Sequence, residues 1–88
     1  MSQGDNINRV NVKIFGEEYT MKSSASPDYM KRLAQYVDEK MIQINYSNNR
    51  LDLNKIAVLM AINMADELFQ ARKDLRELEE LLDKRTSL

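Results

Sequence analysis

The stretch that decides the fold runs from Asp52 to Thr86 and reads DLNKIAVLMAINMADELFQARKDLRELEELLDKRT. Neither Pro nor Gly interrupts it, so it predicts one continuous helix, roughly 50 Å long at a rise of about 1.5 Å per residue. A globule built from an 88-residue chain does not need a helix of that length. We therefore expect part of the helix to leave the globule as an arm.

Apolar residues recur along this predicted helix at the a and d positions of a heptad. The positions of this seam are Ala57, Ala61, Met64, Leu68, Ala71, Leu75, Leu78 and Leu82. An arm that exposes such a seam to water is expected to associate with a second copy. The pattern therefore predicts a coiled coil and a homodimer, while it leaves a tetramer and the relative direction of the helices open.

A second apolar stripe lies on another face of the first half of the same helix. It consists of Val58, Ile62, Ala65 and Phe69. Beyond Phe69 the corresponding face carries charged residues. We interpret the first half as packing on its own head as well as on a partner, and the second half as an arm with one apolar seam.

The residues before the long helix predict a β-hairpin and a shorter helix. Polar and apolar residues alternate from Arg9 to Ile14 and again from Glu18 to Lys22, on either side of a turn that contains Gly16. Ser26 can cap a helix whose first residue is Pro27. The apolar residues that follow at spacings of three and four predict a helix of roughly 18 residues. They are Met30, Leu33, Ala34, Val37, Met41 and Ile44.

Turn-forming residues from Asn45 to Arg50 are expected to end this shorter helix, and Asp52 is expected to cap the long one. The predicted class is therefore α+β, with a hairpin and helix as a small head and a long C-terminal helix. The expected division is a flexible tail at residues 1–8, the head at 9–51 and the long helix at 52–88.

The composition excludes most catalytic chemistry. The chain has no His, no Cys and no Trp, which removes thiolate chemistry, His-based triads and the usual zinc sites. Two glycines cannot build the usual phosphate-binding loop. Adjacent carboxylates such as Asp38 and Glu39 point roughly 100° apart on a helix, so they are expected to be solvated. We predict no enzymatic activity, no bound metal and no cofactor.

The charge balance argues against nucleic acid as a partner. Thirteen basic and fourteen acidic residues give a net charge of −1 and a pI near 5.4. No early apolar stretch resembles a signal peptide, and the longest apolar run, from Ile56 to Ile62, is too short to cross a bilayer. We therefore expect neither nucleic-acid nor membrane binding.

An ordered set of motifs resembles one known family. Val10-x-Val12-x-Ile14-Phe15-Gly16, followed by Tyr19, resembles the opening hairpin of the ZapA family of bacterial cell-division proteins. The stretch from Leu59 to Leu68, LMAINMADEL, is similar to that family's LAALNIADEL signature. Between these, Tyr29-Met30-x-x-Leu33-Ala34 and Val37-Asp38-x-Lys40-Met41 also fit. The resemblance covers about residues 9 to 85 and is closest to the short form of the family.

The resemblance implies a cytoplasmic protein at the mid-cell division ring that binds FtsZ and cross-links its filaments. It also implies a head-paired dimer that can associate further through the arms. We expect the junction between the helices to contact FtsZ, because exposed polar residues there are held by two rigid elements. The residues chosen by chemistry and position are Asn48, Asn49, Arg50, Asn54 and Lys55.

A ribbon-helix-helix DNA-binding dimer is the alternative function. Arg9, Asn11 and Lys13 lie on one face of the first predicted strand, as such a ribbon would present to the major groove. The Gly16 turn, the long second helix and the acidic pI argue against it. On the long helix, the polar side that carries Asn63 and Glu67 is expected to be solvated or hydrogen-bonded to the head.

Overall fold

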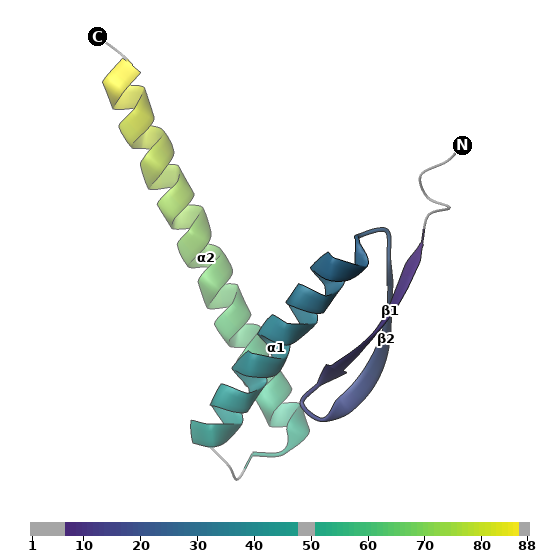
Figure 1. Cartoon of the computed structure of the whole chain (residues 1–88). Coiled ribbons are helices and arrows are strands. Elements are labelled where there is room, and N and C mark those ends of the chain that lie inside the picture. Colours follow the sequence, from purple (N-terminus) through teal and green to yellow (C-terminus); the bar gives the residue numbers. More distant parts are fainter. Residues whose placement is uncertain (1–6, 48–50, 87–88) are drawn as a thin grey trace.

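The structure is a computed structural model that describes residues 7–47 and 51–86. Its elements follow in the order β1 (Asn8–Ile14), β2 (Glu17–Ser23), α1 (Pro27–Ser47) and α2 (Leu53–Thr86). The hairpin lies along α1, and α2 crosses the lower part of α1 and then diverges from it, so that the two helices form a V (Figure 1). This arrangement confirms the predicted α+β fold of a hairpin, a helix and a long C-terminal helix.

The hairpin turns at two residues, Phe15 and Gly16, which both have positive φ angles, of 52° and 82°. Such a turn fits the twist of the flanking strands, but a non-glycine residue rarely adopts it. Here the Phe15 amide donates a hydrogen bond of 2.7 Å to Oδ1 of Asp38, and the ring packs against the cluster at the helix junction. The interpretation of Asp38 as a solvated carboxylate was therefore wrong, since it ties the turn to α1.

Helix α1 begins as predicted, because Ser26 Oγ accepts a hydrogen bond of 3.2 Å from the Tyr29 amide and Pro27 is the first helical residue. It ends later than predicted. Residues 45–47 were expected in the turn, yet they complete the helix, and Ser47 Oγ donates a hydrogen bond to the Gln43 carbonyl oxygen. Backbone hydrogen bonding and the packing of Ile44 outweigh the weak turn preference of Asn and Ser at these positions.

The apolar core consists of two small clusters on opposite ends of α1. One joins the hairpin to the start of α1 and contains Val10, Val12, Met30 and Ala34. The other joins the end of α1 to the start of α2 and contains Met41, Ile56 and Met60. Ile14 packs against both clusters, so the hairpin is coupled to the helix junction.

The predicted tail extends too far by one residue. Asn8 is the first residue of β1, and its side-chain amide donates a hydrogen bond of 2.9 Å to the Ala25 carbonyl oxygen. This contact fixes the open end of the hairpin to the linker before α1. Residues 1–6 lie outside the described residues.

Candidate functional site

The heptad seam is uncovered along its whole length in the single chain. All eight predicted interface residues are exposed. Among the larger ones, Met64 is 38% exposed, Leu68 48% and Leu75 57%, while Leu78 and Leu82 are each 53% exposed. From residue 68 to residue 85 every side chain of α2 is exposed, so nothing in the single chain covers the seam there.

A different face of α2 packs on its own head. Ile56 and Met60 are 2% and 5% exposed, and Glu67 reaches α1 further along the same face. The first half of the helix was predicted to pack on its own head, but the second apolar stripe does not make this contact: Val58, Ile62 and Phe69 are 59%, 60% and 64% exposed. The spacing of four and then seven residues from Ile56 through Met60 to Glu67 places them on one side of the helix.

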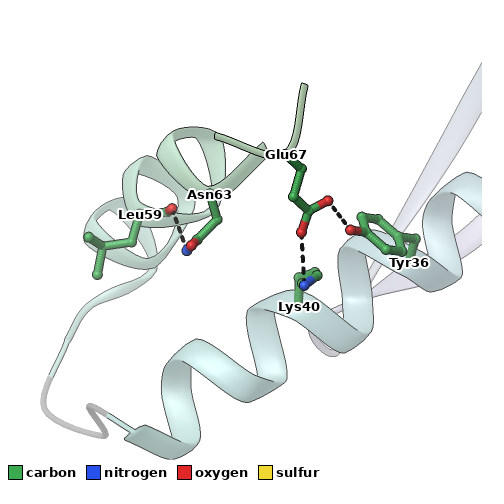
Figure 2. Close-up of polar contacts among 5 residues, drawn as sticks. All are labelled: Tyr36, Lys40, Leu59, Asn63 and Glu67. Carbon is green, nitrogen blue, oxygen red and sulfur yellow. Dashed lines mark hydrogen bonds and ion pairs between the residues drawn. The ribbon is translucent and has the colours of Figure 1, made fainter. Parts of the chain in front are cut away.

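Glu67 of α2 is bonded to two residues of α1 (Figure 2). Its Oε1 accepts a hydrogen bond from the Tyr36 hydroxyl, and its Oε2 lies 2.9 Å from Nζ of Lys40. Tyr36 and Lys40 are four residues apart and so lie on the same face of α1. The polar side of α2 is thus hydrogen-bonded to the head at Glu67, which is one of the two outcomes expected from the sequence.

The ionisation of these three groups is coupled. The hydrogen bond from Tyr36, followed by the one from Lys40, holds the pKa of Glu67 below its usual range. The hydrogen bond to Glu67 raises the pKa of Tyr36, because the carboxylate holds the phenolic proton. The same carboxylate raises the pKa of Lys40. All three shifts favour the paired arrangement at neutral pH.

The Asn63 side chain bonds to the backbone of its own helix. Its side-chain amide donates a hydrogen bond of 3.0 Å to the Leu59 carbonyl oxygen one turn earlier (Figure 2). Together with Lys40, Gln43 and Ser47 it borders an open hollow between α1 and α2. The hollow lies beside the Glu67 contact and adds no titratable group beyond Lys40.

The predicted FtsZ-contact residues are only partly within the structure. Asn48, Asn49 and Arg50 lie outside the described residues. Asn54 and Lys55 are exposed in the first turn of α2, beside an apolar hollow that Leu51 and Val58 also line. Asp52 caps this turn as predicted, because its Oδ1 accepts a hydrogen bond of 2.9 Å from the Lys55 amide.

No cluster suited to metal chemistry occurs in residues 7–47 and 51–86: nowhere do three or more His, Cys, Asp or Glu side chains gather around one point. Within the same ranges no helix combines the length and the hydropathy needed to cross a bilayer.

Sequence reasoning missed two contacts of this region. The Tyr36–Lys40–Glu67 group leaves only a partial signal in the sequence: Tyr36 and Lys40 are four residues apart on α1, but nothing in either helix indicates that this face meets Glu67. The Asp38–Phe15 contact joins residues 23 positions apart and leaves no local pattern.

A small packed head with a projecting helix and an uncovered apolar seam defines a class of protein: one that acts by assembling with other chains. The comparisons with known proteins identify the family. The model of the family described as "Cell division protein ZapA" matches residues 10–87.

Individual relatives agree with the family match. Cell division protein ZapA of Geobacillus kaustophilus is 38% identical over 76 residues, which cover 86% of this chain and 84% of that protein. The protein of the same name from Halalkalibacterium halodurans is 39% identical over 72 residues, covering 82% and 79%. A solved "ZapA mutant dimer from Geobacillus stearothermophilus" is 34% identical, with a TM-score of 0.68 and coverage of 88% of this chain and 90% of that one.

The chain therefore belongs to the ZapA family of cell division proteins. Members are non-enzymatic, and membership implies that the chain binds FtsZ and promotes assembly of the Z-ring. The ribbon-helix-helix alternative is set aside, because both strands of the hairpin come from one chain and the family is shown.

Proposed function

We propose that the chain forms a homodimer through its heptad seam and cross-links FtsZ filaments with the two heads of that dimer. A symmetric dimer presents each binding surface twice, and a repeating polymer presents its epitope many times, so each bound head raises the effective concentration of the other. The solved Geobacillus stearothermophilus relative is described as a dimer, which supports the assignment.

One observation carries this proposal: the seam stays exposed to solvent beyond the head. Leu75, Leu78 and Leu82 are more than half exposed, although each would be buried in a coiled coil. Such a row on a free helix is the surface expected of a protein that works as an oligomer.

The substitution Leu75→Glu tests the dimer. Each helix would then carry one charge into the packed seam, which should cost several kcal/mol of association free energy, so the helices should separate. Sedimentation velocity at micromolar concentration should give a dimer or tetramer for the wild type and a smaller species for the variant. Equal masses for both proteins would contradict the seam.

Cross-linking is separated from binding by pelleting at two speeds. A monomeric Leu75→Glu protein should still sediment with single FtsZ filaments at high speed, but it should form no bundles that pellet at low speed. Lys84→Glu, which also introduces a Glu on the exposed arm and changes the net charge by more than Leu75→Glu does, is the control and should bundle like the wild type. Normal bundling by monomeric Leu75→Glu would refute the cross-linking proposal.

We place the FtsZ contact at the helix junction, with Asn48, Asn49, Arg50, Asn54 and Lys55. Asn54 and Lys55 support this assignment, because they are exposed on a helix turn that the Asp52 cap holds in place, so binding orders few side chains. An apolar hollow beside them offers a partner some area to bury. Localisation to the mid-cell ring would follow from this contact.

Lys55→Glu tests the junction without weakening the fold. Glu three residues after the Asp52 cap suits the positive end of the helix dipole, so α2 should keep its helicity. Affinity for FtsZ filaments should fall by about tenfold, as expected for reversal of an interfacial charge. Unchanged co-sedimentation would remove Lys55 from the site, and a fluorescent fusion of the same variant should leave the mid-cell ring.

A further inference from the structure

The outer face of the hairpin carries an arrangement of charge that the proposed function does not use. The β1–β2 register places Arg9 directly opposite Lys22, Asn11 opposite Thr20 and Lys13 opposite Glu18. All six side chains are exposed, on the face that points away from the α1 core. Like charges directly opposite each other destabilise a strand pair, so the Arg9–Lys22 pair opposes the folding of the hairpin that carries it.

Arg9 and Lys22 face each other across the strands, whereas Lys13 faces Glu18. Arg9, Lys13 and Lys22 form no ion pair with any residue in the described part of the chain. Between Arg9 and Lys13, Asn11 is oriented by Thr20, whose hydroxyl donates a hydrogen bond of 2.7 Å to Asn11 Oδ1. This bond occupies the amide oxygen and leaves the Asn11 NH2 group as a donor to solvent.

The row along β1 thus presents donors only: a guanidinium, an amide NH2 and an ammonium. Residues two apart on a strand recur about every 6.6 Å on one face, given a rise of about 3.3 Å per residue. Carboxylates at alternate positions of a second extended segment recur at the same distance. The face is complementary to an acidic peptide in extended conformation.

We propose that the outer face of the hairpin, formed by Arg9, Asn11, Lys13 and Lys22, binds an acidic, extended segment of a partner protein. A protein segment fits better than nucleic acid, because Glu18 lies on the same face and the chain has a net charge of −1. This surface is separate from the helix junction. An experiment that disproves binding at the hairpin face would therefore leave the proposed FtsZ contact at the junction untouched, and the reverse also holds.

Arg9→Glu tests the proposal with a substitution that is not expected to unfold the hairpin. The substitution turns the repulsive Arg9–Lys22 pair into an attractive one, so the hairpin should be at least as stable as in the wild type. Any loss of binding then cannot come from unfolding. Lys22→Glu repeats the test from the other strand, and Lys84→Glu on the arm changes the net charge equally without touching the hairpin.

The probe is poly-L-glutamate, titrated against the 15N-labelled full chain at low and high salt. We expect amide shifts on residues 9–13 and 18–22, weakening as salt screens the charges, and a Kd about tenfold weaker for Arg9→Glu and for Lys22→Glu but not for Lys84→Glu. Shifts confined to other residues, or wild-type affinity in the Arg9→Glu protein, would overturn the proposal. Tighter binding of a short DNA duplex than of poly-L-glutamate at equal salt would overturn the choice of a protein partner.

Discussion

The two halves of α2 form one unbroken helix, yet they depend on different partners. In the half nearest the junction, Ile56 and Met60 are buried against α1 and Glu67 is bonded to it. In the half beyond Glu67 every described side chain is exposed, including a row of leucines. The first half is held by its own chain, whereas the second has apolar surface that only another chain can cover.

This comparison shows that an apolar stripe with helical periodicity does not indicate which surface the stripe packs against. Both halves have apolar stripes, but the most buried residues of α2 belong to neither the seam nor the second stripe. The burial of the inner half follows from the packing of Ile56 and Met60 against Met41 of α1. The three predictions below test this contrast, from the largest expected effect to the smallest.

The same substitution in two environments provides the strongest test. Ile56→Ala should lower the free energy of unfolding by about 2–5 kcal/mol, because it empties a buried site in the junction cluster. Ile62→Ala removes the same atoms from a side chain that is 60% exposed and should cost about 0.5 kcal/mol or less in the dilute protein. Urea denaturation across a range of protein concentrations measures both effects.

Urea denaturation at several protein concentrations also tests whether a second copy of the chain covers Ile62. If Ile62 is covered in the dimer, the cost of Ile62→Ala should grow as the protein associates, while that of Ile56→Ala should stay constant. Equal costs for the two substitutions in the dilute protein would contradict the division of α2 into a packed face and an uncovered one.

Loss of the helix cap should have a smaller effect. Asp52→Ala removes the acceptor of the Lys55 amide hydrogen bond and should destabilise the packed half of α2 by about 1 kcal/mol. Asp66→Ala removes a similar charge from an exposed position in mid-helix and is the matched control. Thermal unfolding followed by circular dichroism should separate the two variants, and equal melting temperatures would rule out a role for the cap.

The smallest expected effect concerns pH. Because Tyr36 and Lys40 lower the pKa of Glu67, this group stabilises the fold above its unfolded pKa, near 4.3, and the stabilisation is lost as the pH falls through the lower folded pKa. Glu67→Gln should flatten the stability profile in that acidic window. Glu77→Gln, which removes the Lys73–Glu77 pair within α2, should leave the acid loss in place.

Local features of the fold could be predicted from the sequence. The hairpin turn at Gly16, the caps at Ser26 and Asp52 and the unbroken course of α2 each depend on residues within a few positions of one another. The end of α1 was missed, because Asn and Ser favour turns only weakly and tertiary packing decided the boundary.

The site was less predictable, for a physical reason. Between Ile56 and Phe69 apolar residues occupy most of the circumference of α2, so no pattern shows which face meets the head. Glu67 was expected on a polar side, but its bonds to Tyr36 and Lys40 depend on the angle between two helices. That angle is a tertiary property with no signature in either helix.

The position of Glu67 also gives the molecule a mechanical property. Taking Met60 as the fulcrum of α2, Glu67 braces the helix about 10 Å away, whereas Thr86 lies about 39 Å away at 1.5 Å per residue. The arm is therefore a lever that multiplies displacement nearly fourfold: a yield of about 1 Å at the carboxylate moves the tip by about 4 Å. The partly exposed Glu67 contact, which salt screens, thus contributes together with the Ile56 and Met60 packing to the angle between the head and the projecting part of α2.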